Sequence, residues 1–402
     1  MSEKVALLDS INSAATEVFQ GSGLEVTTFP KSLSSEELSE VVQDVQLLGV
    51  RSGPKISGSV IEAGDELVAI GCFCVGTNHI DHDAANRSGV AIFNSLHENT
   101  RSVAEHVIAS AFGLLRRIPE HNLSMHMGAW TKTDERSHEV RGKIIGIVGY
   151  GVVGSQVSVL AEAIGMDVVY YDPSPQIPPL GRAKRTETLE ELLSIADVVT
   201  LHVPGGERTE GMIDDEAISL MKPGAYLINT ARGEVVDYEA VARALESGQL
   251  GGIAADVFED EPSKEGDKFD HILRGISRAT LTPHIAGSTI EAQTDIGNKT
   301  AAKLLTYLFS GNSSGSVNLP VLPLNGLQPG ITRLLNVHDN VSGVMASISG
   351  AIAEAGLNVT SLAQKTREEL GYAAFDIEGD VTVDLVNVIK QMQHSRRTRL
   401  ID

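Results

Sequence analysis

In residues 1–98, short hydrophobic runs alternate with stretches in which apolar side chains recur at helical spacing. Segments 33–42 and 81–88 predict helices, the first with Ser34 or Ser35 as its N-cap. The short runs predict strands, which we place at 5–8, 45–48, 67–70 and 90–93. Strands that alternate with helices favour a parallel sheet.

A second unit repeats strand, turn and helix over residues 143–286, after a long helical pattern at 102–117. A helix at about 290–309 follows, where it is placed to return the chain to the first unit. Segment 311–324 is rich in Gly, Ser, Asn and Pro and predicts a linker. The strands of the second unit are expected at 144–148, 167–171, 198–201, 225–228, 252–256 and 279–281.

The tail, residues 325–402, predicts a third arrangement. Its expected elements are a strand at 332–337, a helix at 343–355, strands at 358–364 and 373–378, a helix at 383–391 and a strand at 398–401. This βαββαβ order is typical of a ferredoxin-like sandwich of one sheet and two helices.

Composition then narrows the protein class. With 402 residues the chain has room for about two to four domains, and 42% hydrophobic with 21% charged residues indicates globular cores. The formal net charge of −21 repels phosphate backbones and anionic lipids, so we expect neither nucleic acid nor a membrane surface as a partner. An anionic substrate must therefore be attracted by local basic groups.

The cysteines and the N-terminus bear on the compartment. Cys72 and Cys74 lie one residue apart in an apolar run, too constrained for an easy disulfide, and we expect them to be small core residues. The sequence shows no Cys/His metal spacing, no signal-peptide pattern and no apolar run of roughly 18 residues. We expect a soluble cytoplasmic protein without a metal site.

The most specific motif is the G-x-G-x-x-G of Gly149, Gly151 and Gly154, between a predicted strand and a helix. The first glycine permits a tight turn, the second lets the backbone approach a pyrophosphate, and the third allows close helix–strand packing. The helix N-terminus favours the diphosphate. Asp172 closes the next strand, 23 residues after Gly149, where its carboxylate would accept ribose hydroxyls and repel a 2′-phosphate. The motif therefore predicts NAD rather than NADP.

Further residues fall at the C-terminal ends of predicted strands, the edge where open α/β sheets bind ligands. We expect Val203 and Pro204 on the adenine side of the cofactor, with ordinary strand-end packing as the alternative. Thr230, Ala231 and Asp256 end other strands of the same unit.

Three residues with complementary chemistry also follow strands of this unit, namely Arg232 in LINTARG, Glu261 in DVFEDEP and His284 in LTPHIAGST. Parallel strands would gather them at one edge of the sheet. His284 suits the base that removes a hydroxyl proton during hydride transfer, and a carboxylate behind it fixes its tautomer. A guanidinium holds a substrate carboxylate bidentately. The sequence thus predicts a dehydrogenase of a small 2-hydroxy acid.

These motifs, with GYGVVG before them, resemble the D-2-hydroxyacid dehydrogenase family. Within it, AIGCFCVGTNHID, ENTRSVAEHV and SLMKPGAYLINTARG resemble the enzymes that oxidise 3-phospho-D-glycerate with NAD, the first step of L-serine biosynthesis. The resemblance spans nearly the whole chain and implies an α/β fold with two Rossmann-like domains and a regulatory tail. It assigns 1–98 and 287–324 to a substrate domain, 99–286 to an NAD-binding domain and 325–402 to the tail.

The resemblance also carries over site residues. It places the catalytic Arg, Glu and His of the family on Arg232, Glu261 and His284. The family usually reads ASRG where this chain has TARG, a mild departure that bears only on cofactor contacts. The implied cofactor contacts are Val152, Val153, Asp172, Thr230, Ala231, Asp256, His284, Ile285, Ala286 and Gly287.

For the substrate, the resemblance places Arg51, Ser52, Gly76 and Asn99 beside it. Arg101 opens the long helix and is a further candidate, and Lys132 is a weaker one. In so acidic a chain, an arginine would anchor the substrate phosphate by charge pairing. The alternative is that Arg51 or Arg101 only pairs with surface carboxylates.

The tail resembles an ACT domain, a small module that binds amino acids, through NVHDNVSGV and EAGLNV. The resemblance implies an L-serine effector site of His338, Asn340 and Asn358, formed where two such modules pair, and a homotetramer. Asp339 stands where the family often has Glu. The alternative is that Asn340 and Asn358 only serve turns and caps.

Two other functions stay open at this point. The same chemistry would serve another 2-hydroxy acid, such as glycerate or 2-hydroxyglutarate, and a side reduction of 2-oxoglutarate. An NAD-sensing binding protein, such as a corepressor, also resembles this family. The tail and the candidate phosphate-binding arginines favour 3-phosphoglycerate.

Overall fold

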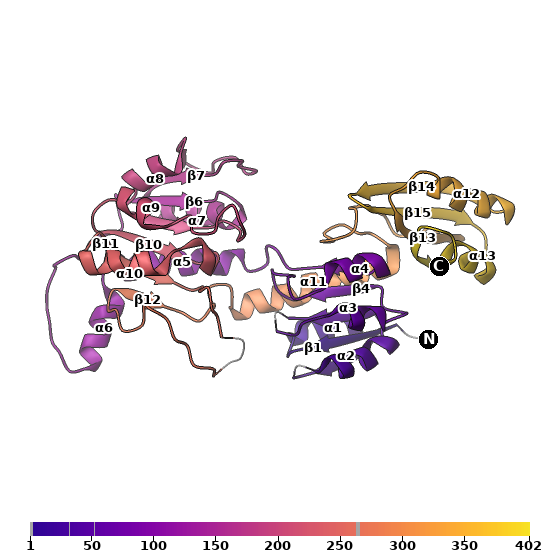
Figure 1. The fold of residues 1–402 in the computed structure, drawn as a ribbon, viewed down its shortest axis with the longest axis horizontal. Coiled ribbons are helices and arrows are strands. Elements are labelled where there is room, and N and C mark those ends of the chain that lie inside the picture. Colours follow the sequence, from indigo (N-terminus) through magenta and orange to yellow (C-terminus); the bar gives the residue numbers. More distant parts are fainter. Residues whose placement is uncertain (1–2, 32, 52, 263–265) are drawn as a thin grey trace. The chain divides into compact units, whose positions relative to one another are not determined.

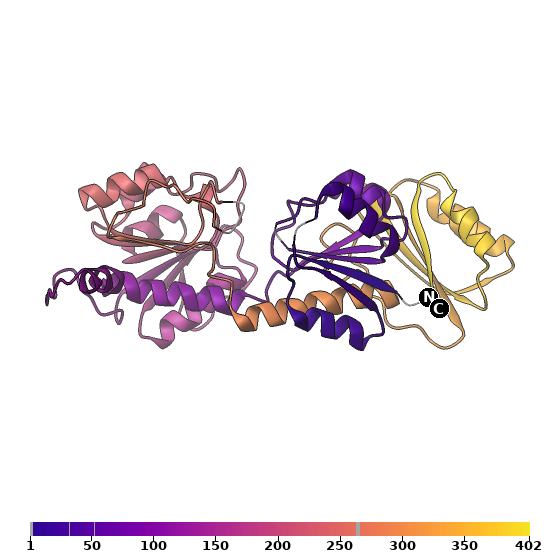
Figure 2. The same cartoon turned by 90° about the horizontal axis from the view of Figure 1, so that it is seen from below.

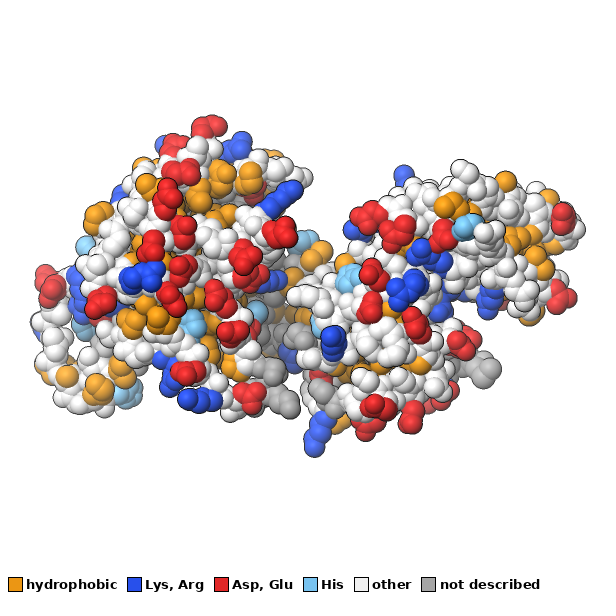
Figure 3. All heavy atoms as spheres, viewed as in Figure 1, with side chains coloured by type: hydrophobic (Ala, Val, Ile, Leu, Met, Phe, Trp, Pro, Cys, Tyr) orange, Lys and Arg blue, Asp and Glu red, His pale blue; other side chains and the backbone are white. Residues whose placement is uncertain are grey.

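The computed structural model describes residues 3–31, 33–51, 53–262 and 266–402. The chain forms two compact units. Unit 1 comprises residues 1–98 and 293–402, and unit 2 is the continuous segment 99–292. Figure 3 shows acidic side chains scattered over the visible faces of both units, as the net charge of −21 requires.

Unit 2 is built on a parallel seven-stranded sheet in the order β12-β11-β10-β9-β6-β7-β8. Its direction of winding reverses between β6 and β9, and such a switch point opens a ligand crevice at the C-terminal edge of the strands. The strands are β6 (Ile144–Val148), β7 (Asp167–Tyr171), β8 (Lys184–Arg185), β9 (Val198–Leu201), β10 (Ala225–Asn229), β11 (Leu250–Ala255) and β12 (Ala279–Leu281).

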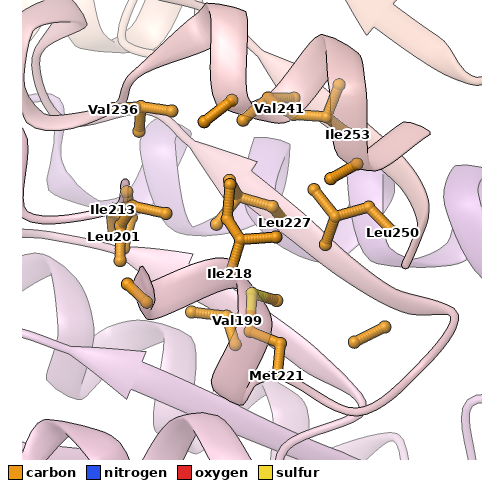
Figure 4. Close-up of a cluster of buried hydrophobic side chains, with 14 of the residues drawn as sticks. Val199, Leu201, Ile213, Ile218, Met221, Leu227, Val236, Val241, Leu250 and Ile253 are labelled. Carbon is orange, nitrogen blue, oxygen red and sulfur yellow. The ribbon is translucent and has the colours of Figure 1, made fainter. Parts of the chain in front are cut away.

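Helices cover both faces of this sheet, because its strands are apolar on both sides (Figure 1). On one face pack α8 (Leu189–Ile195), α9 (Asp215–Leu220) and α10 (Tyr238–Ser247). On the other pack α5 (Thr100–Leu115) and α7 (Val152–Ala163). Figure 4 shows the first of these cores, in which Leu227 and Ile253 of the sheet meet Ile218 and Val241 of the helices.

Unit 1 contains a parallel five-stranded sheet in the order β2-β1-β3-β4-β5. The strands are β1 (Lys4–Leu8), β2 (Glu25–Phe29), β3 (Leu47–Val50), β4 (Ala69–Cys72) and β5 (Ala91–Phe93). This order also has a switch point, between β1 and β3, and the C-terminal end of β3 leads directly to Arg51.

Helices again cover both faces of the five-stranded sheet. One face packs against α2 (Ser35–Val41), α3 (Gly58–Glu62) and α4 (His82–Ser88). The other packs against α1 (Ser13–Gly21) and the returning helix α11 (Ile290–Ser310), which runs along the sheet in Figure 2. Ser34 caps α2 as predicted, in a reciprocal capping box with Glu37.

The predicted linker at 311–324 connects α11 to the tail, but it is an integral part of unit 1. Asn318 accepts a hydrogen bond from the backbone N–H of Ile92 at 2.8 Å, and Val317 donates to the Ile92 carbonyl. Leu319 and Leu322 are buried in the core shared with β1 and α11. The segment therefore satisfies the outer edge of β5, which would otherwise be unpaired.

The tail forms an antiparallel sheet in the order β14-β15-β13-β16, with the predicted βαββαβ sequence of elements. Helices α12 and α13 lie on one side of it (Figure 1). Along β15, Phe375 and Ile377 face these helices, whereas Tyr372 and Ala374 face the core of unit 1. The elements are β13 (Ile331–Asp339), α12 (Val344–Glu354), β14 (Asn358–Arg367), β15 (Leu370–Glu378), α13 (Val383–Lys390) and β16 (Ser395–Ile401).

Arginines of β16 fix the tail to the first sheet. Arg396 donates to the carbonyl of Asn86, and Arg397 donates to the carbonyl of Ser88, both at the C-terminal end of α4. Positive charge is favourable there because the carbonyls at a helix end carry partial negative charge. Arg399 donates to the carbonyl of Leu308 at 2.8 Å.

Several elements were missed in the sequence. Strand β2 and helices α1 and α3 are short, and the pattern of β2 is mostly exposed because it lies at the sheet edge. Helix α6 (Ile118–His126) begins directly after α5 and buries none of its residues, so it has no apolar face that periodicity would detect.

Candidate active site

Glu261 and His284 form a hydrogen-bonded pair at the C-terminal edge of the seven-stranded sheet. The loop after β11 carries Glu261 and the loop after the neighbouring β12 carries His284. Glu261 Oε2 lies 2.7 Å from His284 Nδ1, and its Oε1 accepts the N–H of Phe258 at 3.1 Å. The glutamate is therefore held from two directions, and the imidazole is left with Nε2 for other work.

Asp256 fixes the backbone that carries His284. It is 1% exposed, and its carboxylate accepts the hydroxyl of Thr282 at 2.6 Å and the N–H groups of Ile285 and Ala286 at 2.9 and 2.8 Å. His284 itself adopts a left-handed backbone conformation with φ of 53°, which is uncommon for a residue with a side chain. The buried carboxylate holds this strained turn in place.

Arg232 enters the same edge from β10. Its loop is anchored by the buried Asn229, which donates to the Arg232 carbonyl at 2.9 Å and accepts the N–H of Ala231 at 3.0 Å. At Gly233 a side chain would overlap the Phe258 backbone, so the Arg232 loop and the Glu261 loop touch backbone to backbone. Glycine is required there for the two loops to meet.

The electrostatics of the pair follow from these contacts. The hydrogen bond that His284 Nδ1 donates to Glu261 raises the pKa of His284, against burial and the nearby Arg232 charge, which both lower it. Burial alone would raise the pKa of Glu261, but the hydrogen bonds from His284 and the Phe258 N–H, with the charge of Arg232, lower it overall. The carboxylate of Glu261 therefore favours the protonated imidazole of His284.

The glycine motif has the geometry that a dinucleotide requires. Gly149 has φ of +93° and lies against the backbone of His202 and the side chain of Val203. At Gly151 an added Cβ would meet none of the described atoms within 4 Å, so the approach to the start of α7 is open. At Gly154 a side chain would collide with the Gly149 carbonyl. These are the three roles predicted from the sequence.

Asp172 follows β7 beside this turn. Its two carboxylate oxygens accept the N–H groups of Tyr150 at 2.9 Å and Ser174 at 2.8 Å. After β10, the hydroxyl of Thr230 is buried with no hydrogen-bond partner among the described residues. An open glycine cradle, a fixed carboxylate and an unsatisfied buried hydroxyl along one sheet edge fit a bound NAD.

The other expected cofactor residues lie on the same edge. Val203 is half-buried and Pro204 is exposed after β9. Val152 and Val153 open α7, whose N-cap has no side-chain hydrogen bond. Ile285 is 45% exposed, Ala286 is buried, and Gly287 lies against the side chain of Asn99.

The candidate substrate residues divide between the units. In unit 1, Arg51 follows β3 at the switch point and has no ion-pair partner within the described ranges, while Gly76 follows β4. Ser52 lies outside the described residues. In unit 2, Asn99 stands at the N-cap position of α5, without a capping hydrogen bond, and lies beside Gly287, whereas Arg101 pairs with Glu105 on the surface at 2.6 Å. Arg101 thus follows the alternative interpretation of a surface ion pair. Lys132 is exposed.

Within one chain, Asn358 lies far from the other two candidate effector residues, His338 and Asn340. His338 is buried, and Asn340 donates to the Glu368 carbonyl at 3.0 Å near the β14–β15 turn. Asn358 pairs opposite Glu378, which in turn pairs opposite Ile331. Seven residues of strand, roughly 24 Å, separate this end of the sheet from His338.

Sequence reasoning missed the residues that support the site. Asn229 and Tyr238 form a buried network in which the Tyr238 hydroxyl donates to the Val257 carbonyl at 2.6 Å. Thr282 orients Asp256. Asn229 had a detectable signal as the first polar residue after an apolar strand, whereas nothing in the sequence around Tyr238 or Thr282 indicates their partners.

Within the described part of the chain, no cluster of His, Cys, Asp and Glu is arranged to hold a metal ion. No helix formed by the described residues has the length and apolar character needed to cross a membrane.

Comparison with known proteins agrees with this geometry. Residues 108–286 match the NAD-binding domain of the D-isomer specific 2-hydroxyacid dehydrogenases. The chain is 41% identical to D-3-phosphoglycerate dehydrogenase of Haemophilus influenzae, over 99% of this chain and 97% of that protein. It is 42% identical to the Escherichia coli enzyme of the same name, with the same two coverages. Among solved structures, Aquifex aeolicus D-lactate dehydrogenase with NAD and lactic acid is similar, with a TM-score of 0.67, 28% identity and coverage of 79% and 99%.

Proposed function

The chain belongs to the D-isomer specific 2-hydroxyacid dehydrogenases, and from that premise we propose that it oxidises 3-phospho-D-glycerate to 3-phosphohydroxypyruvate. This is the first step of phosphorylated L-serine biosynthesis, and the electron acceptor is NAD. The observation that supports it most directly is the Glu261–His284 pair on the sheet edge that carries the glycine cradle. The substrate is inferred from relatives that carry the name of this activity and are matched over 97% of their own length.

In the proposed reaction, NAD held by the Gly149–Gly154 turn and Asp172 would supply the acceptor for the hydride from C2 of the substrate. His284 Nε2 takes the proton of the C2 hydroxyl, because its Nδ1 is engaged by Glu261. Glu261 stabilises the imidazolium that results. Arg232 holds the substrate carboxylate and polarises the carbonyl in the reverse direction. The same groups would support a side reduction of 2-oxoglutarate.

The phosphate contact is assigned to Arg51, with Ser52, Gly76 and Asn99 as further substrate contacts. Arg51 stands at the switch point of a parallel sheet, where ligands bind, and no described carboxylate pairs with it. Arg101 is a poorer candidate because Glu105 already neutralises it. We assign residues 1–98 and 287–324 to a substrate-binding domain and residues 99–286 to an NAD-binding domain. Arg51, Ser52 and Gly76 belong to the first, and Asn99 is the first residue of the second.

The activity is tested by NADH formation from 3-phosphoglycerate and NAD, with D-glycerate, D-lactate and 2-hydroxyglutarate as alternative substrates. We expect 3-phosphoglycerate to give by far the highest kcat/KM, and His284→Ala to lose turnover while it still binds NADH. If the chain turns over only another of these acids, that acid takes the place of 3-phosphoglycerate as the proposed substrate. Absent turnover with every acid, despite NADH binding, would favour a dinucleotide-sensing protein.

We further infer that residues 325–402 are an ACT domain that binds L-serine between two copies of the chain. One chain holds Asn340 and Asn358 at opposite ends of its sheet. Because β14 is an end strand, antiparallel pairing with a second β14 would bring Asn358 of one copy to the Asn340 end of the other. Asn340→Ala should keep turnover and lose suppression by serine, whereas Asn387→Ala, an exposed asparagine on α13, should change neither.

A tetramer requires a second contact, for which α6 and the loop after it are suited. The exposed fractions are 54% for Leu123, 74% for Met127 and 82% for Trp130, an apolar group that unpartnered proteins rarely expose. We assign it to a second copy of this chain. Trp130→Asp should reduce the mass measured by light scattering from tetramer to dimer, and an unchanged mass would contradict the assignment.

We also propose that the protein is cytoplasmic, because its free thiols Cys72 and Cys74 suit a reducing compartment.

A further inference from the structure

The basic residue Arg185 lies beside the carboxylate that selects the cofactor. Strand β8 pairs with β7 in parallel, with Arg185 opposite Tyr170, two residues before Asp172. From there Arg185 Nη2 donates to the backbone carbonyl of Asp172 at 3.0 Å. The guanidinium is therefore fixed at the point of the sheet edge where the adenosine ribose of a dinucleotide binds.

The remaining donors of this guanidinium have no ion-pair partner in the described part of the chain, and the side chain is exposed. A guanidinium has five N–H donors, and only Nη2 of Arg185 donates to the Asp172 carbonyl. The Asp172 carboxylate is turned instead to the N–H groups of Tyr150 and Ser174. A negative and a positive group thus stand side by side at the same ribose edge without pairing to each other.

We propose that Arg185 is a second specificity-determining residue of the dinucleotide site, with affinity for a 2′-phosphate that Asp172 masks. The proposal rests on the NAD site described above. A ribose 2′-hydroxyl donates a hydrogen bond to the Asp172 carboxylate, so NAD is favoured. A 2′-phosphate is repelled by that carboxylate and attracted by Arg185, and an arginine near this position is what accommodates NADP in dinucleotide folds.

The repulsion of a 2′-phosphate by Asp172 outweighs its attraction by Arg185. The Asp172 carboxylate is held by two backbone N–H groups, whereas the Arg185 side chain is exposed and its charge is screened by solvent. The intact site therefore selects NAD. Once the carboxylate is neutralised, the anchored guanidinium is left as the dominant charge at the ribose edge. The same chain then binds the phosphorylated cofactor without any residue being added.

The test is calorimetric titration of the full chain with NADH and with NADPH, in the absence of substrate. Asp172→Asn removes the charge and keeps one acceptor oxygen, and we expect it to tighten NADPH binding at least tenfold. Adding Arg185→Ala to that variant should weaken NADPH again by about tenfold to a hundredfold, the range for hydrogen bonds to charged groups. Lys184→Ala is the matched control, because it removes the same charge one position away on the same strand.

We expect Lys184→Ala to change NADPH binding by less than about threefold, since its charge acts only through the screened field. Equal losses from Lys184→Ala and Arg185→Ala, or no loss from Arg185→Ala, would overturn the proposal. If Asp172→Asn does not fold, the single variant Arg185→Ala still decides, because it must raise the ratio of the NADPH to NADH dissociation constants. Failure of the intact chain to bind NADH would refute the dinucleotide site itself, whereas a null effect at Arg185 with normal NADH binding refutes only this proposal.

Discussion

Replacing Glu261 by Gln tests the proposed base. The amide keeps an oxygen of the same shape 2.7 Å from His284 Nδ1 but removes the negative charge. That charge raises the pKa of His284, so the pKa falls in the variant and the imidazole loses its proton at lower pH. In the proposed mechanism oxidation requires neutral His284 and rises with pH, so the rising limb of the oxidation profile should move to lower pH in the variant. Reduction requires the imidazolium, so its falling limb should move in the same direction.

The size of the loss follows from the exposure of the pair. A hydrogen bond to a charged group contributes about 1.5–3 kcal/mol when buried. The side chains of His284 and Glu261 are 53% and 35% exposed, so solvent screening reduces this value. We expect about 1.4 kcal/mol at the plateau, which is a roughly tenfold loss of kcat/KM.

The assay is the pH dependence of kcat/KM in both directions, for the intact chain and for Glu261→Gln. Asp260→Asn is the control, because it removes a carboxylate from the same turn, next to Glu261 in the sequence. Its pH profile should superimpose on that of the intact chain. A profile of Glu261→Gln with unchanged midpoints would refute the role of Glu261 in raising the His284 pKa, whatever the loss of rate.

Three other variants test separate parts of the structure. Arg51→Met should raise KM for 3-phosphoglycerate at least tenfold with little change in the weak turnover of D-glycerate, and equal effects on both substrates would remove the phosphate contact. Arg333→Met breaks a buried pair with Asp376, at 2.5 and 2.8 Å, and should lower the free energy of unfolding by about 3 kcal/mol in urea titration. Gly233→Ala places a methyl group against the Phe258 backbone and should cost about 1–3 kcal/mol of stability as well as turnover; retention of both would show that the two loops separate freely.

The strands of unit 2 were the most predictable part of the fold. β6, β7 and β9 have the bounds expected from their apolar runs, because strands inside a parallel sheet are covered on both faces and read as continuous hydrophobic segments. β12 also has its expected bounds, although it is an end strand and only partly buried. Strand β2 was not predictable, because an edge strand leaves much of its surface in water and its residues EVTTF carry little pattern. The burial of segment 311–324 was equally hidden, since it depends on partners more than two hundred residues away.

The candidate site shows the same division. The residues proposed to carry the chemistry lie where strands end, and strand ends can be predicted from the sequence. Glu261 and His284 were therefore singled out from the sequence, and the structure places them 2.7 Å apart. The contact of Asp256 with the cofactor stays a prediction, whereas the hydrogen bonds that its carboxylate accepts from Thr282, Ile285 and Ala286 were not foreseen. Such supporting contacts arise between loops and are decided by tertiary packing, which no local pattern encodes.

The contacts of α11 and β16 with the first sheet impose an order on how the protein is made. Unit 2 is one uninterrupted segment of the chain. All its strands therefore emerge from the ribosome in succession, and it is able to fold as soon as residue 292 has emerged. The first sheet is synthesised earlier but completed later, because the cover of Leu7 and Phe93 includes Leu304 of α11. The carbonyls at the end of α4 gain their hydrogen bonds from Arg396 and Arg397 only after β16 has been synthesised. The nascent chain therefore carries an N-terminal sheet with an uncovered apolar face from the synthesis of β5 until α11 has emerged.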